Sequence, residues 1–168
     1  MADATHTLPA SDAEPTPFTT AGFERIVSTL RTAVLREEHL DAIALDDADS
    51  DVDLGAAQDA AVDAWCAVEA ETAAFLRAHR EASLTPLADT ATRIDTMLSL
   101  TGVDDKAMLF SLVTDTMILR TNVAPTGPEE RLLGDLLPWM YRTSVIQSAF
   151  LPDDASACDP IDDFAPAA

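Results

Sequence analysis

The stretch of sequence that decides the fold runs from Leu54 to Glu81 and reads LGAAQDAAVDAWCAVEAETAAFLRAHRE. It contains no proline, and its single glycine, Gly55, lies at its start. Its apolar side chains recur at the spacing of a helix. They are Ala61, Val62, Trp65, Cys66, Val68, Ala73, Phe75 and Leu76. A helix of this length would span roughly 40 Å. The stretch therefore predicts an elongated helical bundle, or a helix that extends into a partner chain.

Four further segments carry the same helical pattern, bounded by residues that begin or end helices. We expect these helices over about Ala21–Ala42, from Ser83 or Thr85 to Gly102, from Asp104 to about Thr121, and from Pro128 to Pro152. Proline is well tolerated in a first helical turn, where Pro86 and Pro128 would lie. Inside the last helix, Pro138 is expected to kink or divide the chain.

No run of alternating apolar and polar residues is long enough to predict a strand. We therefore predict an all-α protein, a single bundle of about five helices over residues 19–151. The proline-containing N-terminal residues 1–18 and the acidic C-terminal residues 152–168 have little apolar character, so we expect disordered tails at both ends.

The predicted fourth helix, from Asp104 to Thr121, is apolar on nearly every side. A helix of that kind is buried in the centre of a bundle or is covered by another subunit. Its large side chains are candidates for contact with a partner, together with two aromatic residues of the 54–81 stretch. The interaction candidates are Met108, Phe110, Met117, Trp65 and Phe75.

The charge of the chain limits its partners. Asp and Glu number 30 and Lys and Arg number 10, for a formal net charge of −20, and Lys106 is the only lysine. Such a surface repels nucleic-acid phosphates and anionic lipid heads, so we expect no nucleic acid and no membrane as partners. Three origins of the acidity remain open: adaptation to high salt, the codon bias of a GC-rich genome, and mimicry of a nucleic acid.

The sequence favours a cytoplasmic location. Residues 1–17 have neither a basic start nor an apolar run, so they do not resemble a secretory signal. No segment approaches the uninterrupted apolar length of a membrane-spanning helix. Cys66 and Cys158 form no disulfide framework, and Cys66, on an apolar face, is expected to be a small core residue.

No constellation of residues predicts catalysis, a metal or a cofactor. The histidines His6, His39 and His79 lack partners at the spacing of a metal site. The alternating aspartates from Asp47 to Asp53 resemble half of a calcium loop, but the glycine and the final glutamate of that loop are missing. We therefore expect no metal and no cofactor, and the sequence leans against an enzyme.

One segment could nevertheless shape a pocket. Trp139, Tyr141 and Arg142 follow Pro138, and a break in a helix exposes backbone groups. Arg120 and Arg142 could then hold an anionic ligand. The alternative is that Trp139 closes one end of the core, because large aromatic residues dominate core packing.

The end of the chain carries a second candidate segment. Asp159–Pro160–Ile161–Asp162–Asp163–Phe164 mixes acidic and bulky apolar residues, a composition that can dock into a basic, hydrophobic groove as a short peptide. The plainer interpretation is a solubilising tail.

These observations predict a non-enzymatic helical interaction protein, such as an adaptor, a chaperone or a regulatory subunit, whose partner is another protein or a second copy in a homodimer. The alternative is a small-molecule-binding or enzymatic bundle with a pocket near Pro138–Arg142. A third possibility is an acidic mimic of a nucleic acid.

Overall fold

The computed structural model describes residues 17–45, 54–79, 85–102, 105–123 and 127–151. Five α-helices account for nearly all of these residues, and no strand occurs among them. The prediction of an all-α bundle of five helices is therefore confirmed. The expected tails at residues 1–16 and 152–168 lie outside the described residues, as do the aspartates of the 46–53 connector.

The helices are α1 (Pro17–Leu45), α2 (Leu54–Ala78), α3 (Pro86–Ser99), α4 (Asp105–Thr121) and α5 (Pro128–Phe150). Their existence and order agree with the sequence pattern, and their ends differ by a few residues. The largest difference is in α1, which begins at Pro17 and so includes residues 17 and 18 of the expected tail. Proline is compatible with a first helical turn because the N–H it lacks would have no partner there.

Local signals in the sequence place the boundaries of α3 and α5. The Thr85 hydroxyl accepts a hydrogen bond of 3.2 Å from the Ala88 backbone N–H and caps α3, and Pro86 follows in the first turn. Leu151 ends α5 in an extended conformation. That conformation is expected before a proline, since the ring of Pro152 disfavours a helical residue ahead of it.

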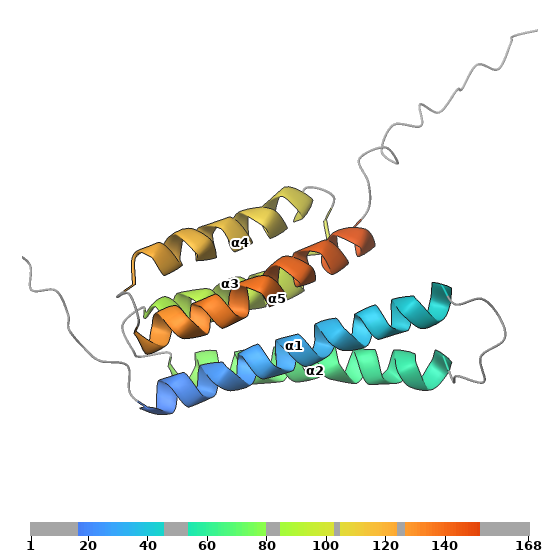
Figure 1. Cartoon of the computed structure of the whole chain (residues 1–168), viewed down its shortest axis with the longest axis horizontal. Helices are drawn as coiled ribbons and strands as arrows, with labels where there is room; N and C mark the ends of the chain where they lie inside the picture. Colours follow the sequence, from blue (N-terminus) through green and yellow to red (C-terminus); the bar gives the residue numbers. More distant parts are fainter. Residues whose placement is uncertain (1–16, 46–53, 80–84, 103–104, 124–126, 152–168) are drawn as a thin grey trace, which may run out of the picture.

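The five helices form layers (Figure 1). The long helices α1 and α2 lie side by side as a hairpin, α3 and α5 pack on that hairpin, and α4 lies on the outside against α5 and α3. The 25 residues of α2 are matched by the 29 residues of α1. Of the two explanations for a long α2, the elongated bundle therefore accounts for its length within one chain.

The core draws on all five helices, but unequally. Its largest fully buried side chains are Phe23, Ile26, Leu30, Leu87, Ile94, Met97, Leu109, Leu133, Leu136, Met140, Val34 and Val68. From α4, only Leu109 and Thr116 are buried. Of the two positions expected for the fourth helix, the centre of the bundle is thus wrong, because this helix turns one narrow face inward and leaves most of its apolar surface at the outside of the bundle.

The exposure of Cys66 is a second correction. The buried residues of α2 are Ala61, Val68, Thr72 and Phe75, which define one side of the helix. Cys66 lies about 140° around the helix from Ala61, at 100° per residue, and is exposed. The sequence pattern placed it in the core because small and apolar residues surround it on all sides of this alanine-rich helix.

Pro138 lies inside α5 and does not divide it. The helix runs as one element from Pro128 to Phe150, so the expected break between two helices is absent from this segment. The described helices include none with the length and apolar character to cross a membrane.

Candidate functional site

An open, apolar groove of about 580 Å³ lies between α4 and α5. Its lining comes from these two helices alone. The residues are Phe110, Val113, Thr114, Met117 and Arg120 of α4, and Gly134, Leu137, Pro138 and Tyr141 of α5. The side chains of Met117 and Tyr141 are 56% and 55% exposed. The groove is therefore a surface onto which another apolar group can pack.

Helical spacing explains how each wall is built. On α4, Phe110, Val113 and Met117 follow one another at intervals of three and four residues, and such positions share one face of a helix. Gly134, Pro138 and Tyr141 repeat the same spacing on α5. A short connection joins the two helices, and they run antiparallel (Figure 1). Their apolar faces therefore border the same groove.

One end of the groove is formed by an arginine that lies across a glycine. Arg120 Nε donates a hydrogen bond of 2.9 Å to Glu130 Oε1, and the two residues form an ion pair. A Cβ atom on Gly134 would lie only 3.0 Å from Arg120 Nη2. The lack of a side chain at Gly134 thus leaves the space in which the guanidinium group of Arg120 reaches Glu130.

The groove is free of the acidity that marks the chain as a whole. Among the described residues that line it there is one cation, Arg120, and no carboxylate. Glu130 balances the charge of Arg120 from the first turn of α5. Lys106 stands one turn before Phe110 on the same stripe of α4. An acidic segment would therefore meet less repulsion here than on a surface dominated by carboxylates.

The structure divides the four predicted ligand-binding residues between two sides of α5. Arg120 and Tyr141 line the groove. Trp139 and Arg142 face α1 instead, where Arg142 donates hydrogen bonds to both carboxylate oxygens of Glu38. Because Arg120 and Arg142 lie on different sides and each is paired with a glutamate, the structure does not bring them together around one anion.

Trp139 and Arg142 of α5 contact Arg31 and Glu38 of α1. The guanidinium carbon of Arg142 lies 4.8 Å from the centre of the Trp139 ring, and that of Arg31 lies 5.5 Å from it. Cations over an aromatic face are attracted by the negative potential of the ring. The half-buried indole also packs against the core. These contacts agree with the alternative interpretation, in which Trp139 closes part of the core.

The five predicted interaction residues also separate. Phe110 and Met117 line the groove, and Met108 is exposed on another side of α4. Trp65 is half-buried and donates a hydrogen bond of 3.0 Å from Nε1 to Glu37 of α1. Phe75 is only 4% exposed and packs edge-on against Phe23 inside the core. In this folded state, the ring of Phe75 offers no contact area to a partner.

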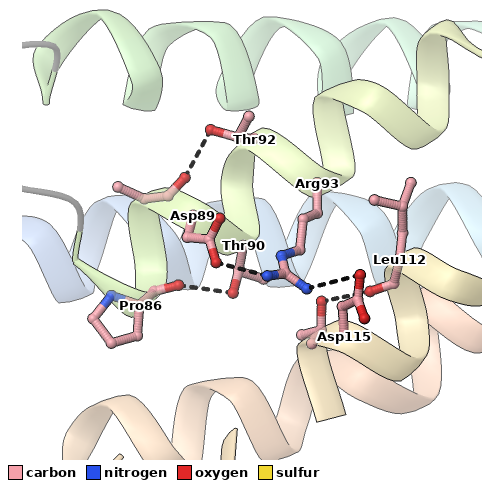
Figure 2. A network of polar contacts seen from close by, with 9 residues as sticks. Pro86, Asp89, Thr90, Thr92, Arg93, Leu112 and Asp115 are labelled. Atoms are coloured by element: carbon pink, nitrogen blue, oxygen red, sulfur yellow. Dashed lines mark hydrogen bonds and ion pairs between the residues drawn. The ribbon is translucent and has the colours of Figure 1, made fainter. Parts of the chain in front are cut away.

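A polar network joins α3 to the outer helix α4 (Figure 2). Arg93 Nη2 donates a hydrogen bond of 2.8 Å to Asp89 on its own helix, and Arg93 Nη1 lies 3.9 Å from Asp115 Oδ2 of α4. The second distance is an ion pair and is too long for a hydrogen bond. The Asp115 side chain is half-exposed, so this pair adds little to the stability of the contact between α3 and α4.

A second, more polar groove of about 360 Å³ lies between the N-terminal parts of α1 and α5. It is lined by Thr20, Glu24, Val27, Pro128, Arg131, Leu132 and Asp135.

Burial raises the pKa of Glu129, which lies outside both grooves in the first turn of α5. Within the described ranges, no three His, Cys, Asp or Glu side chains are grouped as metal ligands would be.

Sequence reasoning missed the part of the groove that comes from α5 before Pro138. These missed residues are Gly134 and Leu137, and on α4 sequence reasoning also missed Val113 and Thr114. The available signal was the three- and four-residue spacing from Gly134 to Tyr141, which places these positions on one face.

Comparison of the chain with protein-family models, curated protein sequences and solved structures finds no match.

Proposed function

We propose that this protein is a non-enzymatic interaction module that binds an apolar segment of a protein partner in the groove between α4 and α5. The observation that carries the proposal is the groove itself, which places the exposed side chains of Phe110, Met117 and Tyr141 around one open space. An amphipathic helix that lies in an apolar groove is a recurring mode of protein recognition. Burial of these side chains would supply the main favourable free energy of association.

The first partner to test is a second copy of the chain. Each copy offers a groove, and α4 also exposes Met108 and Ile118 outside it. One subunit thus carries both a groove and apolar side chains that can enter a groove on its partner. The charge of −20 on each copy opposes this contact, and salt screens the repulsion. We therefore expect self-association to increase with salt.

Light scattering tests this form of the function. We expect a molar mass above the monomer value of 17.9 kDa at high salt, and a lower mass at low salt. Met117→Asp should shift the mass toward the monomer because it places a charge in the groove. Val62→Asp is the matched control, since Val62 is equally exposed but lies on α2, away from the groove. Equal loss of association in both variants would contradict a role for the groove.

A small apolar molecule is the second candidate for the groove. Its volume of about 580 Å³ is within the usual range of ligand sites, roughly 300–1,000 Å³. Such a ligand would bind without changing the molar mass, so light scattering separates the two candidates.

The proposal also includes a cytoplasmic location, which rests on the absence of a disulfide pattern in the sequence.

A further inference from the structure

We propose that the C-terminal segment 159–164 of the same molecule docks in the α4–α5 groove and covers it until a partner displaces it. This inference rests on the proposed function, because it assigns a regulator to the same groove. The segment reads DPIDDF. Ile161 and Phe164 would enter the groove, and Asp159, Asp162 and Asp163 would stay at its edges.

The composition of the chain after α5 supports this occupant. Ile161 and Phe164 are the only large apolar residues between Pro152 and Ala168. They stand three residues apart, a spacing that puts two side chains on one side of a helical turn. The groove offers matching apolar contacts on both walls, from Phe110 and Met117 on α4 and from Tyr141 on α5.

The position of the segment along the chain makes the contact possible. Leu151 is buried at the end of α5 and fixes the point from which the following residues depart. Tyr141 lies ten residues earlier on the same helix, about 15 Å away along its axis. The ten residues from Pro152 to Ile161 can span up to about 33 Å. The chain is therefore long enough to return along α5 and place Ile161 in the groove.

The charge of the groove lining is compatible with binding of this acidic segment. The segment 152–168 carries five aspartates and no basic residue. Acidic residues outnumber basic ones in the rest of the chain as well, so such a segment is repelled from surfaces rich in carboxylates. The groove lining holds Arg120 and no carboxylate among its described residues, and Lys106 stands on the same stripe of α4. The segment therefore meets no carboxylate on the described walls of this groove.

A segment of the same molecule also has an advantage over a second copy. Attachment to α5 gives it an effective concentration in the millimolar range. A second copy must instead approach against the charge of −20 on each chain. The segment therefore competes with self-association, and its release should lower the protein concentration at which dimers form.

Paramagnetic broadening of methionine methyl signals tests the contact in the full-length chain. A nitroxide label is placed on Cys158, three residues before Ile161, in a Cys66→Ser background that removes the exposed second thiol. The label broadens nearby methyl signals, with a steep dependence on distance. We expect loss of signal from Met108 and Met117 of α4, and a weaker effect on Met97, which is buried in α3.

The matched control is the double variant Ile161→Ser and Phe164→Ser, which keeps the charge and the label. The selective broadening of Met117 should disappear in it. Equal broadening of Met97 and Met117 in the unsubstituted tail, or no broadening, would overturn the proposal. So would broadening that arises only between a labelled copy and an isotope-enriched copy in a mixed sample, since the segment would then bind in trans.

The same double variant separates this inference from the proposed self-association. If selective broadening is seen and the double variant forms dimers at lower concentration, both proposals stand. If selective broadening is seen but the double variant remains a folded monomer at high salt, the intramolecular contact stands and self-association fails. If broadening is absent and the wild-type chain forms dimers, self-association stands and the intramolecular contact fails.

Discussion

Neighbouring residues of α5 belong to different surfaces of the molecule. Tyr141 lines the groove toward α4, whereas the next residue, Arg142, bonds to Glu38 of α1. Successive residues of a helix are rotated by about 100°, so a run of adjacent candidates cannot all face one ligand. Gly134, by contrast, allows residues of two helices to come together. Because it has no side chain, the guanidinium group of Arg120 from α4 can lie against it.

At Glu129, the structure predicts a stability effect that depends on pH. Burial raises the pKa of this carboxyl above its ordinary value of 4.5, because desolvation disfavours the charged form. The cost of the charged form is absent below the unfolded-state pKa and is complete above the folded-state pKa. Glu129→Gln should therefore raise the free energy of unfolding at neutral pH.

This stabilisation should shrink as the pH falls, because wild-type Glu129 becomes neutral as well. Chemical denaturation between pH 7 and pH 3 would follow the difference between the two proteins. Glu69→Gln, at an exposed position of α2, removes one charge without burial and is the control. A stabilisation by Glu129→Gln that stays constant or grows toward acid pH would contradict the assigned cause.

At this scale, the sequence predicted the kind of residue in the site better than its arrangement. Phe110, Met117, Arg120 and Tyr141 were candidates from their chemistry, and they share one groove. They had been assigned to two separate surfaces, because one sequence does not show which helices become neighbours. Phe75 shows the same limit, since a helical apolar pattern does not distinguish a core position from an exposed contact.

Among the elements, α5 carries an internal proline and remains one helix. Pro138 has no N–H to donate to the carbonyl of Gly134, and its ring crowds that carbonyl group. The exposed position of Pro138 leaves room for the local distortion. α5 packs against α1, α3 and α4. This packing offsets the cost of a proline inside the helix.

Pro138→Ala should stabilise the protein. Proline in a helix interior is about 3 kcal/mol less favourable than alanine, and part of this is offset by the restricted unfolded chain. We expect the free energy of unfolding to rise by about 1–2 kcal/mol. Pro128→Ala, in the first turn of the same helix, is the control and should change stability by less than about 0.5 kcal/mol. Destabilisation by Pro138→Ala would show that the ring makes contacts that α5 requires.

The elements themselves were predictable from sequence because each helix carries a regular apolar pattern and recognisable boundaries, as at Thr85 and Pro86. The position of α4 was not predictable in the same way. Its apolar residues occur on nearly every side, so the pattern contains no preferred direction toward the core. Only the packing against α3 and α5 selects the face that carries Leu109 and Thr116.

For the whole molecule, the dominant feature is the net charge of −20 on 168 residues. The described ion pairs include Arg25–Glu71, Arg120–Glu130 and Arg142–Glu38, and each links two different helices. Because acids outnumber bases three to one, most carboxylates have no basic residue available to them. Compact folding brings these charges together and costs free energy by mutual repulsion.

We propose adaptation to high salt as the origin of this charge, and stability measurements at several salt concentrations test it. The Debye length falls from about 30 Å at 0.01 M to about 3 Å at 1 M salt. The free energy of unfolding should therefore rise with NaCl concentration, and sucrose at matched osmolality should not reproduce the early part of the rise. Full stability in dilute buffer would instead favour genome composition as the cause of the acidity.

The stripe of α4 that borders the groove begins at Lys106, and this residue has a practical consequence for chemical labelling. It carries the only side-chain primary amine of the chain. An amine-reactive fluorophore therefore has one lysine to modify in this sequence, and that lysine stands one turn before Phe110 of the groove lining. Selective reaction at Lys106 would convert occupation of the groove into an optical signal that can be followed in time.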